Sequence, residues 1–286
     1  MKKLLLSAFV ICLAGTSIAQ ESPLWMRHCA LSPDGTTIAF TYKGDIYTVP
    51  STGGRATQIT TNPAFDTEPV WSPDSKQIAF ASDRMGSLDV FVVSSEGGTP
   101  QRLTTHSGSE KPVAYKDNKH ILFTANIAPS AEDAGFPSGQ FQQVYEVAVT
   151  GGRPAMFSSM PMECISINKE GVMLYQDKKG YEDYWRKHQV SPIARDIWTY
   201  TPGKKPVYQK QTTFGGEDRE PVWSPDGKSF YYLSEEKGSF NIFQRTPGTT
   251  TSQQITFHTK HPVRFLSIST TGTLCYGLSL IHISEP

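Results

Sequence analysis

The stretch EPVWSPDS at residues 68–75 decides the fold of this chain, because it returns as EPVWSPDG at residues 220–227. A shorter copy, LSPDG, occupies residues 31–35. Each copy is followed by an apolar segment of strand-forming residues, such as IAF at residues 78–80. Self-similarity at a period of about 40 residues is typical of a β-propeller, in which each repeat folds into one four-stranded blade.

Six turns align on this stretch, at intervals of 40 to 56 residues. They are centred on Asp34, Asp74, Asp117, Glu170, Asp226 and Thr271. The alignment predicts an all-β fold, a six-bladed β-propeller of four-stranded antiparallel blades, over residues 20–278. The two widest intervals predict insertions in the third and fourth blades. Because the sixth repeat stops near Leu278 after its inner strands, we expect the last blade to be incomplete.

Within each repeat the residue types suit their expected places. Proline presets φ for the second position of a turn, aspartate bonds the local backbone, and glycine accepts the position that follows. The serine and aspartate of SPDG therefore belong to turns and do not indicate a serine hydrolase. Trp71 and Trp223 are expected to fill the space between blades. An acidic residue or asparagine precedes the third strand of several repeats, and a segment such as QITT at residues 58–61 forms the outer strand.

The two ends differ from the repeats. Residues 1–19 combine a basic start, a short apolar stretch and the small-residue pattern SIA, which predicts a secretory signal peptide cleaved after Ala19. A lipoprotein anchor at Cys12 is the alternative, disfavoured by the bulky Ile11 before it. Export to the bacterial periplasm or beyond is expected. Residues 279–286 lack repeat character and resemble translated sequencing-adapter read-through, which predicts that the natural chain continues; a genuine short tail is the alternative.

Composition excludes some functions. The chain carries 27 basic and 27 acidic side chains, so no global field attracts nucleic acid or an anionic membrane surface. No apolar segment after the signal peptide is long enough to span a membrane. The mature cysteines, Cys29, Cys164 and Cys275, are odd in number and fall in or beside expected strands, which favours buried thiols over a disulfide framework, although one bridge remains an alternative.

No motif for catalysis or for a cofactor stands out. The sequence lacks a GxSxG nucleophile elbow, an HExxH zinc motif, a P-loop and a dinucleotide fingerprint. His258 and His261 have a spacing that suits a metal, but no third ligand is evident, so no metal and no cofactor is expected. The charged run Glu217–Glu220 is expected to form a solvated loop at one mouth of the propeller.

Two segments break the repeat. Residues 128–140 are rich in proline, glycine and serine and predict a long exposed loop, a common place for contacts with a partner or substrate. In the widened fourth repeat, aromatic residues interleave with basic ones at residues 178–188 and lead to IARDIW at residues 193–198. This second segment is interpreted either as a surface loop held by its aromatic side chains or as a peptide contact.

The run YWRKH at residues 184–188, followed by residues 191–198, resembles the tricorn protease family, whose first propeller carries a Trp-Lys-x-Tyr stretch, a glycine-rich link and an Ile-Trp strand. Residues SPIAR at 191–195 replace the glycine-rich link here. The resemblance extends over the mature chain to about Leu278. It implies the N-terminal, non-catalytic propeller of a periplasmic serine peptidase whose catalytic residues lie in downstream domains that this chain does not contain.

The resemblance also implies a role in gating or guiding peptides, with basic side chains that help to hold a peptide terminus. Lys111, Arg186 and Lys187 are the basic residues that we select for this role, because they lie between blades or in repeat-breaking loops. Expected partners are peptides or unfolded protein and the downstream domains of the same protein.

Two alternatives remain open. One is a periplasmic protein-binding scaffold like the Tol-system propeller protein (TolB-like), although that protein carries an α/β domain before its propeller and this chain begins its first repeat soon after the signal peptide. The other is the propeller of a prolyl-oligopeptidase-type enzyme, which would be followed by a GxSxG hydrolase domain.

Overall fold

The computed structural model describes residues 26–127, 142–180 and 190–278, and all regular structure in these ranges is β-strand. The strands form five four-stranded antiparallel sheets and one two-stranded sheet. The first two sheets contain β1 (Arg27–Leu31), β2 (Thr37–Tyr42), β3 (Asp45–Pro50), β4 (Thr57–Gln58), and then β5 (Asp66–Trp71), β6 (Gln77–Ser82), β7 (Asp89–Ser94) and β8 (Gln101–Arg102).

In every sheet the strands pair in chain order, as in a simple meander. The third and fourth sheets contain β9 (Lys111–Asp117), β10 (His120–Ala125), β11 (Gln143–Ala148), β12 (Ala155–Ser158), and then β13 (Met162–Ile167), β14 (Met173–Asp177), β15 (Ile197–Thr201) and β16 (Val207–Lys210). The fifth contains β17 (Asp218–Trp223), β18 (Phe230–Ser234), β19 (Asn241–Arg245) and β20 (Ser252–Gln254), and the two-stranded sheet contains β21 (Val263–Ile268) and β22 (Leu274–Leu278).

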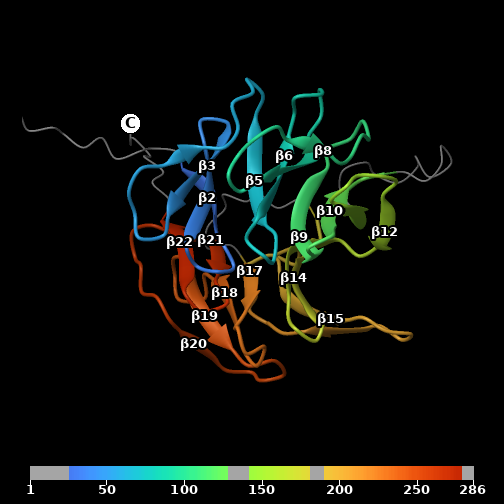
Figure 1. The fold of residues 1–286 in the computed structure, drawn as a ribbon. Coiled ribbons are helices and arrows are strands. Elements are labelled where there is room, and N and C mark those ends of the chain that lie inside the picture. The colour runs from blue at the N-terminus through green and yellow to red at the C-terminus, as the bar shows by residue number, and fades with distance from the viewer. Residues whose placement is uncertain (1–25, 128–141, 181–189, 279–286) are drawn as a thin grey trace, which may run out of the picture.

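The six sheets stand around one central axis as blades (Figure 1). The first strands of the blades, β1, β5, β9, β13, β17 and β21, contact one another in that order, and β21 returns to contact β1. Leu31 N donates to Ser267 Oγ at 3.0 Å across this last junction. The short sixth sheet therefore closes the ring, although among the described residues it lacks the two outer strands of the other blades.

The turns of neighbouring blades meet on one face of the ring. Within a turn, the serine hydroxyl donates to the aspartate, as Ser72 Oγ does to Asp74 Oδ1 at 2.7 Å. Between turns, Asp34 N donates to Ser75 Oγ at 3.2 Å and Asp74 N donates to Asn118 Oδ1 at 3.1 Å. The repeated phrase thus shapes its own blade and fastens it to the next one, and the assignment of its serine and aspartate to turns is confirmed.

The core lies between blades, not within them. Ala39, Ile46 and Ile59 of the first blade pack in one cluster with Trp71, Ile78, Phe80 and Phe91 of the second. Trp71 Nε1 donates to Ala30 O of the first blade at 2.9 Å, and Trp223 Nε1 donates to Val172 O of the fourth at 3.1 Å. The expected role of these tryptophans is therefore confirmed.

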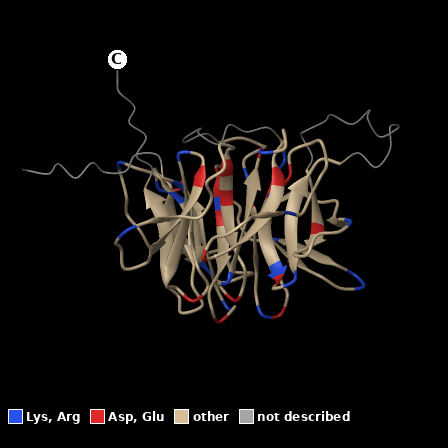
Figure 2. Cartoon of the chain, turned by 45° about the horizontal axis from the view of Figure 1, so that its top comes forward, with Lys and Arg blue, Asp and Glu red and all other residues tan. Residues whose placement is uncertain are grey.

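The structure confirms the all-β fold and its four-stranded blades, with five full blades and a partial sixth. The predicted signal peptide, the predicted loop of residues 128–140 and the tail of residues 279–286 lie outside the described residues. No helix in the described part of the chain is long and apolar enough to cross a membrane. Acidic and basic residues are interspersed over strands and loops (Figure 2), as the balanced composition implies.

Candidate functional site in the central channel

One position of every inner strand faces the central channel. This position lies six residues before the aligned turn residue, and its six occupants, which we name the channel ring, are His28, Glu68, Lys111, Cys164, Glu220 and Phe265. All six line a cavity of about 870 Å³ whose wall is drawn mainly from the six inner strands. The propeller repeat thus places six chemically different side chains around one opening.

A bulge directs the channel ring inward. Five of its members have left-handed backbone, with φ of 51° at His28, 56° at Glu68, 50° at Cys164, 49° at Glu220 and 59° at Phe265. In each of these strands the register with the second strand shifts at that point. A non-glycine residue in this conformation costs about 1–2 kcal/mol, and such strain gathers at functional sites. The same departure in five blades marks the channel ring as the candidate site.

Contacts between neighbouring blades hold the ring. Lys111 Nζ lies 2.6 Å from Glu68 Oε1, and the rings of His28 and Phe265 lie 4.8 Å apart. Leu266 N donates to Glu220 Oε2 at 2.8 Å. Burial lowers the pKa of His28 and outweighs the opposing charge of Glu68. His28 is therefore neutral near pH 7, and the ring carries two carboxylates against one ammonium.

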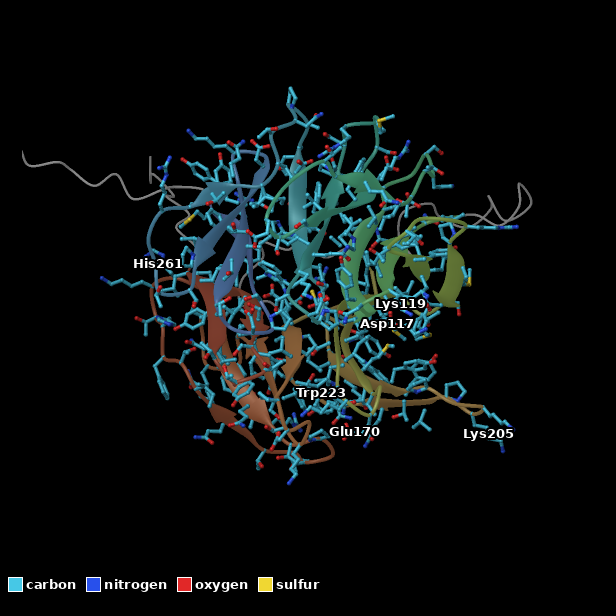
Figure 3. The ribbon with its side chains drawn as sticks, in the orientation of Figure 1. Asp117, Lys119, Glu170, Lys205, Trp223 and His261 are labelled. Carbon is cyan, nitrogen blue, oxygen red and sulfur yellow. The ribbon has the colours of Figure 1, made fainter. Side chains whose placement is uncertain are left out.

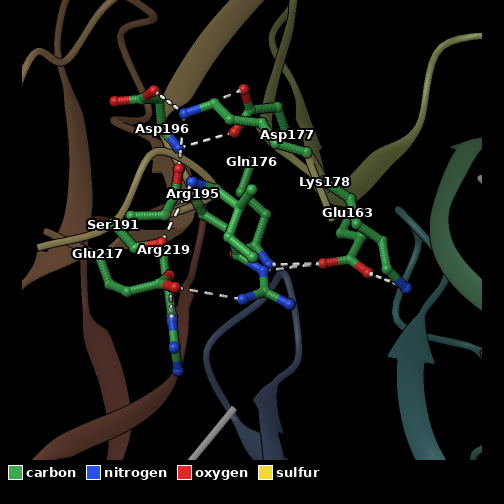
Figure 4. Close-up of polar contacts among 12 residues, drawn as sticks. Glu163, Gln176, Asp177, Lys178, Ser191, Arg195, Asp196, Glu217 and Arg219 are labelled. Carbon is green, nitrogen blue, oxygen red and sulfur yellow. Dashed lines mark hydrogen bonds and ion pairs between the residues drawn. The ribbon is translucent and has the colours of Figure 1, made fainter. Parts of the chain in front are cut away.

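A chain of alternating charges runs beside the ring (Figure 4). Lys178 Nζ lies 3.4 Å from Glu163 Oε1, Arg195 Nε lies 3.2 Å from Glu163 Oε2, and Arg195 Nη1 lies 3.4 Å from Glu217 Oε1. Arg219 Nε completes the chain at 2.8 Å from Glu217 Oε2. Lys178, Glu163 and Arg195 also line the channel cavity. Lys178 and Arg195 are thus held in place at the channel wall by the carboxylates of Glu163 and Glu217.

Electrostatics keeps Glu163 and Arg195 ionised. Burial opposes the charge on Glu163, but Arg195 and Lys178 outweigh it and lower the pKa of that carboxyl group. Burial would likewise lower the pKa of Arg195, and the carboxylates of Glu163 and Glu217 raise it instead. The channel wall therefore presents fixed charges near neutral pH, which suits the binding of a charged polypeptide more than the transfer of protons.

The expectation of buried cysteine thiols is wrong: Cys164 is exposed and lines the channel, and Cys29 and Cys275 are half-buried. The thiol of Cys164 is nevertheless enclosed by the channel wall. This enclosure, followed by the charges of Glu220 and Glu163, raises the pKa of Cys164 well above its usual value. A thiol in this state is a poor nucleophile, since the thiolate is the reactive form.

The peptide-binding role selected from the sequence stays a prediction for all three basic residues. Lys111 belongs to the channel ring, whereas Arg186 and Lys187 lie outside the described residues. Lys178 and Arg195 were missed, although they flank the repeat-breaking segment. The channel ring could have been found in the sequence by comparing the residues that lie six positions before each aligned turn residue.

One further expectation is wrong. The run Glu217–Glu220 is not a solvated loop: its four residues are at most 8% exposed, and three of them begin β17. No group of three metal-ligating side chains occurs within residues 26–127, 142–180 and 190–278. His258 Nε2 instead lies 3.3 Å from Tyr276 Oη.

Comparisons with known proteins agree with this architecture. The family model described as the tricorn protease N-terminal β-propeller domain matches residues 23–278. Tricorn protease homolog 1 of Streptomyces coelicolor is 39% identical over 213 residues, which cover 74% of this chain and 19% of that protein. The chain thus spans about a fifth of that relative.

Among solved structures, the crystal structure of the tricorn protease matches 90% of this chain and 24% of its own, with a TM-score of 0.74 at 16% identity. TolB from Acinetobacter baumannii matches 78% of this chain and 52% of its own, with a TM-score of 0.56 at 17% identity. At such identities the two likenesses concern the fold alone.

Proposed function

The chain belongs to the tricorn protease N-terminal β-propeller family, and on that premise we propose that it guides peptides through its channel as the non-catalytic propeller of a larger serine peptidase. The catalytic residues would lie in other domains of that protein. The observation that carries the proposal is the channel itself, whose wall presents Lys111, Lys178 and Arg195 within a cavity of about 870 Å³.

The chemistry of the wall suits a peptide terminus. A carboxylate is bound best by cationic donors that are already positioned, because charge-assisted hydrogen bonds are about twice as strong as neutral ones. Lys178 and Arg195 share the carboxylate of Glu163, so both cationic side chains are held in place at the channel wall before a ligand arrives. Glu68 and Glu220 would disfavour acidic side chains and select among peptides by charge.

The finer description of the fold belongs to the same proposal. We interpret the two-stranded sheet as the inner half of a sixth blade, because its bulge and its channel residue Phe265 repeat those of the full blades. In this interpretation the propeller is six-bladed, and its channel is formed by the inner strands alone.

Peptide binding to the purified chain tests the proposal. We expect a labelled peptide with a free carboxyl terminus to bind more tightly than its amidated form, as measured by fluorescence anisotropy. The double variant Lys111→Gln/Lys178→Gln should weaken binding by about tenfold or more, since a hydrogen bond to a charged group contributes about 1.5–3 kcal/mol.

The matched control is Lys204→Gln/Lys205→Gln, which removes two exposed lysines from the tip of the β15–β16 hairpin, away from the ring (Figure 3). This variant should bind as the unmodified chain does. Equal affinity of the channel variant and the unmodified chain would overturn the proposal. If neither peptide bound at all, a TolB-like role as a protein-binding scaffold would be the better account.

Export is part of the proposal and has its own test. Expressed in a bacterium that exports proteins to its periplasm, the chain should be recovered there with Gln20 as its first residue. Recovery from the cytoplasm with the leader intact would contradict it. A leader of this composition is removed during secretion, which supports the expectation.

A further inference from the structure

A second site is indicated by one buried carboxylate outside the channel ring. Asp218 begins β17 and Asp66 begins β5, and each lies eight residues before the turn aspartate of its blade. Both are buried, at 1% and 0% exposure. A buried carboxylate needs a partner, since an unpaired one costs several kcal/mol. The two blades meet this need differently.

The second blade neutralises Asp66 with its own arginine. Arg84 Nη2 lies 3.0 Å from both carboxylate oxygens of Asp66. The Arg84 guanidinium also lies over two rings, with Cζ 4.5 Å from the centroid of Phe91 and 5.6 Å from that of Phe80. A carboxylate and two aromatic faces thus form a complete receptor for a guanidinium group, and this blade fills it from within.

The fifth blade keeps the carboxylate and both rings in sequence but not the arginine, and of the two rings only Tyr232 lines the cavity beside Asp218. Tyr232 and Phe243 occupy the places of Phe80 and Phe91, with ring centroids 6.0 Å apart against 5.9 Å in the second blade. Glu236 occupies the place of Arg84, ten residues after the turn aspartate. Neither carboxylate oxygen of Asp218 has a hydrogen-bond partner. A cavity of about 200 Å³, which we name the Asp218 cavity, is lined by Asp218, Tyr232 and Glu236, among others.

The charges around the Asp218 cavity favour a cation. Glu236 lines it; Asp196 disfavours the charged form of Asp218 but is itself paired with Lys179 and Lys210 and does not line the cavity. The hydroxyls of Ser234 and Thr212 act in the opposite direction and lower the pKa of Asp218, but burial outweighs them. Arg245 is the cation in the lining, and its Nε already donates to Thr249 O at 2.8 Å. The carboxylates therefore outnumber the single guanidinium, which is engaged elsewhere.

We propose that the Asp218 cavity binds the guanidinium group of an arginine side chain. In the bound state the guanidinium would pair with Asp218 and lie against the Tyr232 ring, as Arg84 does with Asp66 and Phe80. Glu236 would supply a second carboxylate. The proposal does not depend on the peptide-guiding role of the channel, because none of these residues belongs to the channel ring.

Titration calorimetry of the full chain with methylguanidinium at pH 7.5 tests the proposal. We expect binding at one site, with methylammonium at least several-fold weaker because it cannot form paired hydrogen bonds. Asp218→Asn should abolish the binding. Glu236→Arg should also abolish it by restoring the arrangement of the second blade, and it should raise the thermal midpoint. Because this variant gains an internal partner, its result does not rest on a damaged fold.

The matched control is Glu96→Gln, which removes one exposed acidic group from the second blade and should bind as the unmodified chain does. The guanidinium group could come from free arginine or from an arginine within a polypeptide, so free L-arginine and a peptide with a central arginine are compared. Binding of the peptide alone identifies a polypeptide ligand. Binding of both shows that the guanidinium group is sufficient. Absence of methylguanidinium binding to the unmodified chain, or equal binding to Glu236→Arg, would overturn the proposal.

Discussion

In five of the six inner strands, a left-handed backbone at one position presents a variable side chain to the central channel. The repeat supplies the same bulge in five blades, and the side chain at the bulge is free to vary, from His28 to Phe265. The architecture therefore separates the residues that build the blade from those that face the channel. This separation explains why the turn aspartates are alike while the channel ring differs from blade to blade.

Asp218 carries the clearest prediction at the residue scale. Burial raises its pKa to about 7, and the nearby carboxylates add to this effect. Its usual pKa is about 3.9, so between these values the folded chain binds more protons than the unfolded chain. The contribution of Asp218 to stability is therefore fully present below pH 4 and is lost as the pH rises through 7.

The variant Asp218→Asn lacks this titration, so it should be more stable than the unmodified chain at pH 8 by an amount that shrinks towards pH 5. Each kcal/mol corresponds to about 2–4 °C in a domain of this size. Thermal melts across pH 5–8 measure the difference. A difference that is the same at every pH would show that Asp218 does not titrate in this range.

At the scale of elements, four blades share a threonine just after the outer strand that bonds to the third strand. The backbone N–H groups of Ile46, Val90, Ile197 and Ile242 donate to the hydroxyls of Thr60, Thr104, Thr212 and Thr256 at 2.9–3.0 Å. The recurrence in four blades explains why the outer strands can be as short as two residues. The threonine hydroxyl accepts a backbone N–H of the third strand that the short outer strand does not pair with.

The second blade offers a matched test of this threonine. Thr104→Val removes the acceptor of the buried Val90 N–H and should cost about 1–3 kcal/mol of unfolding free energy, because the donor is left unsatisfied. Thr105→Val is the same substitution one residue later, at an exposed position, and should change stability by less than about 0.5 kcal/mol. Chemical denaturation measures both. Equal effects of the two variants would refute the assigned role.

At the scale of the whole molecule, the ring depends on its last junction. Ser267 Oγ accepts from Leu31 N across the closing junction, and Ser166 Oγ accepts from Trp223 N at 3.1 Å across an interior junction. The two serines occupy the same position of their repeats, four residues before the aligned turn residue. The closing junction therefore uses the same bond as an interior one, despite the shorter sheet behind it.

If the ring is closed in solution, Ser267→Ala and Ser166→Ala should lower stability by similar amounts, about 1 kcal/mol each. If the two-stranded sheet were detached, Ser267→Ala would have no effect while Ser166→Ala kept its cost. Chemical denaturation compares the two, and amide exchange of Leu31 shows directly whether its N–H is protected. Rapid exchange at Leu31 would contradict a closed ring.

The sequence by itself determined the class of fold, the number of repeats and the role of the repeated phrase. These depend on local chemistry: a proline, an aspartate and a glycine shape a turn wherever they stand, and apolar triplets after each turn form strands. The same local chemistry placed Trp71 and Trp223 between blades and took the SPDG serines out of consideration as catalytic groups. Lys111 was selected as a residue between blades, and the structure places it at the start of β9.

Only the tertiary structure decided which residues meet. Arg195 and Glu163 lie far apart in the chain and pair because β13 and the segment before β15 belong to one blade. As a run of charges in the sequence, residues 217–220 suggest a solvated loop. In the folded ring these residues are buried, because Glu217 pairs with Arg195 and Arg219, Glu220 accepts from Leu266 N, and Asp218 lines a cavity. The Asp218 cavity becomes visible only when two blades are superimposed in space, since it depends on an arginine that one repeat has and the other replaces.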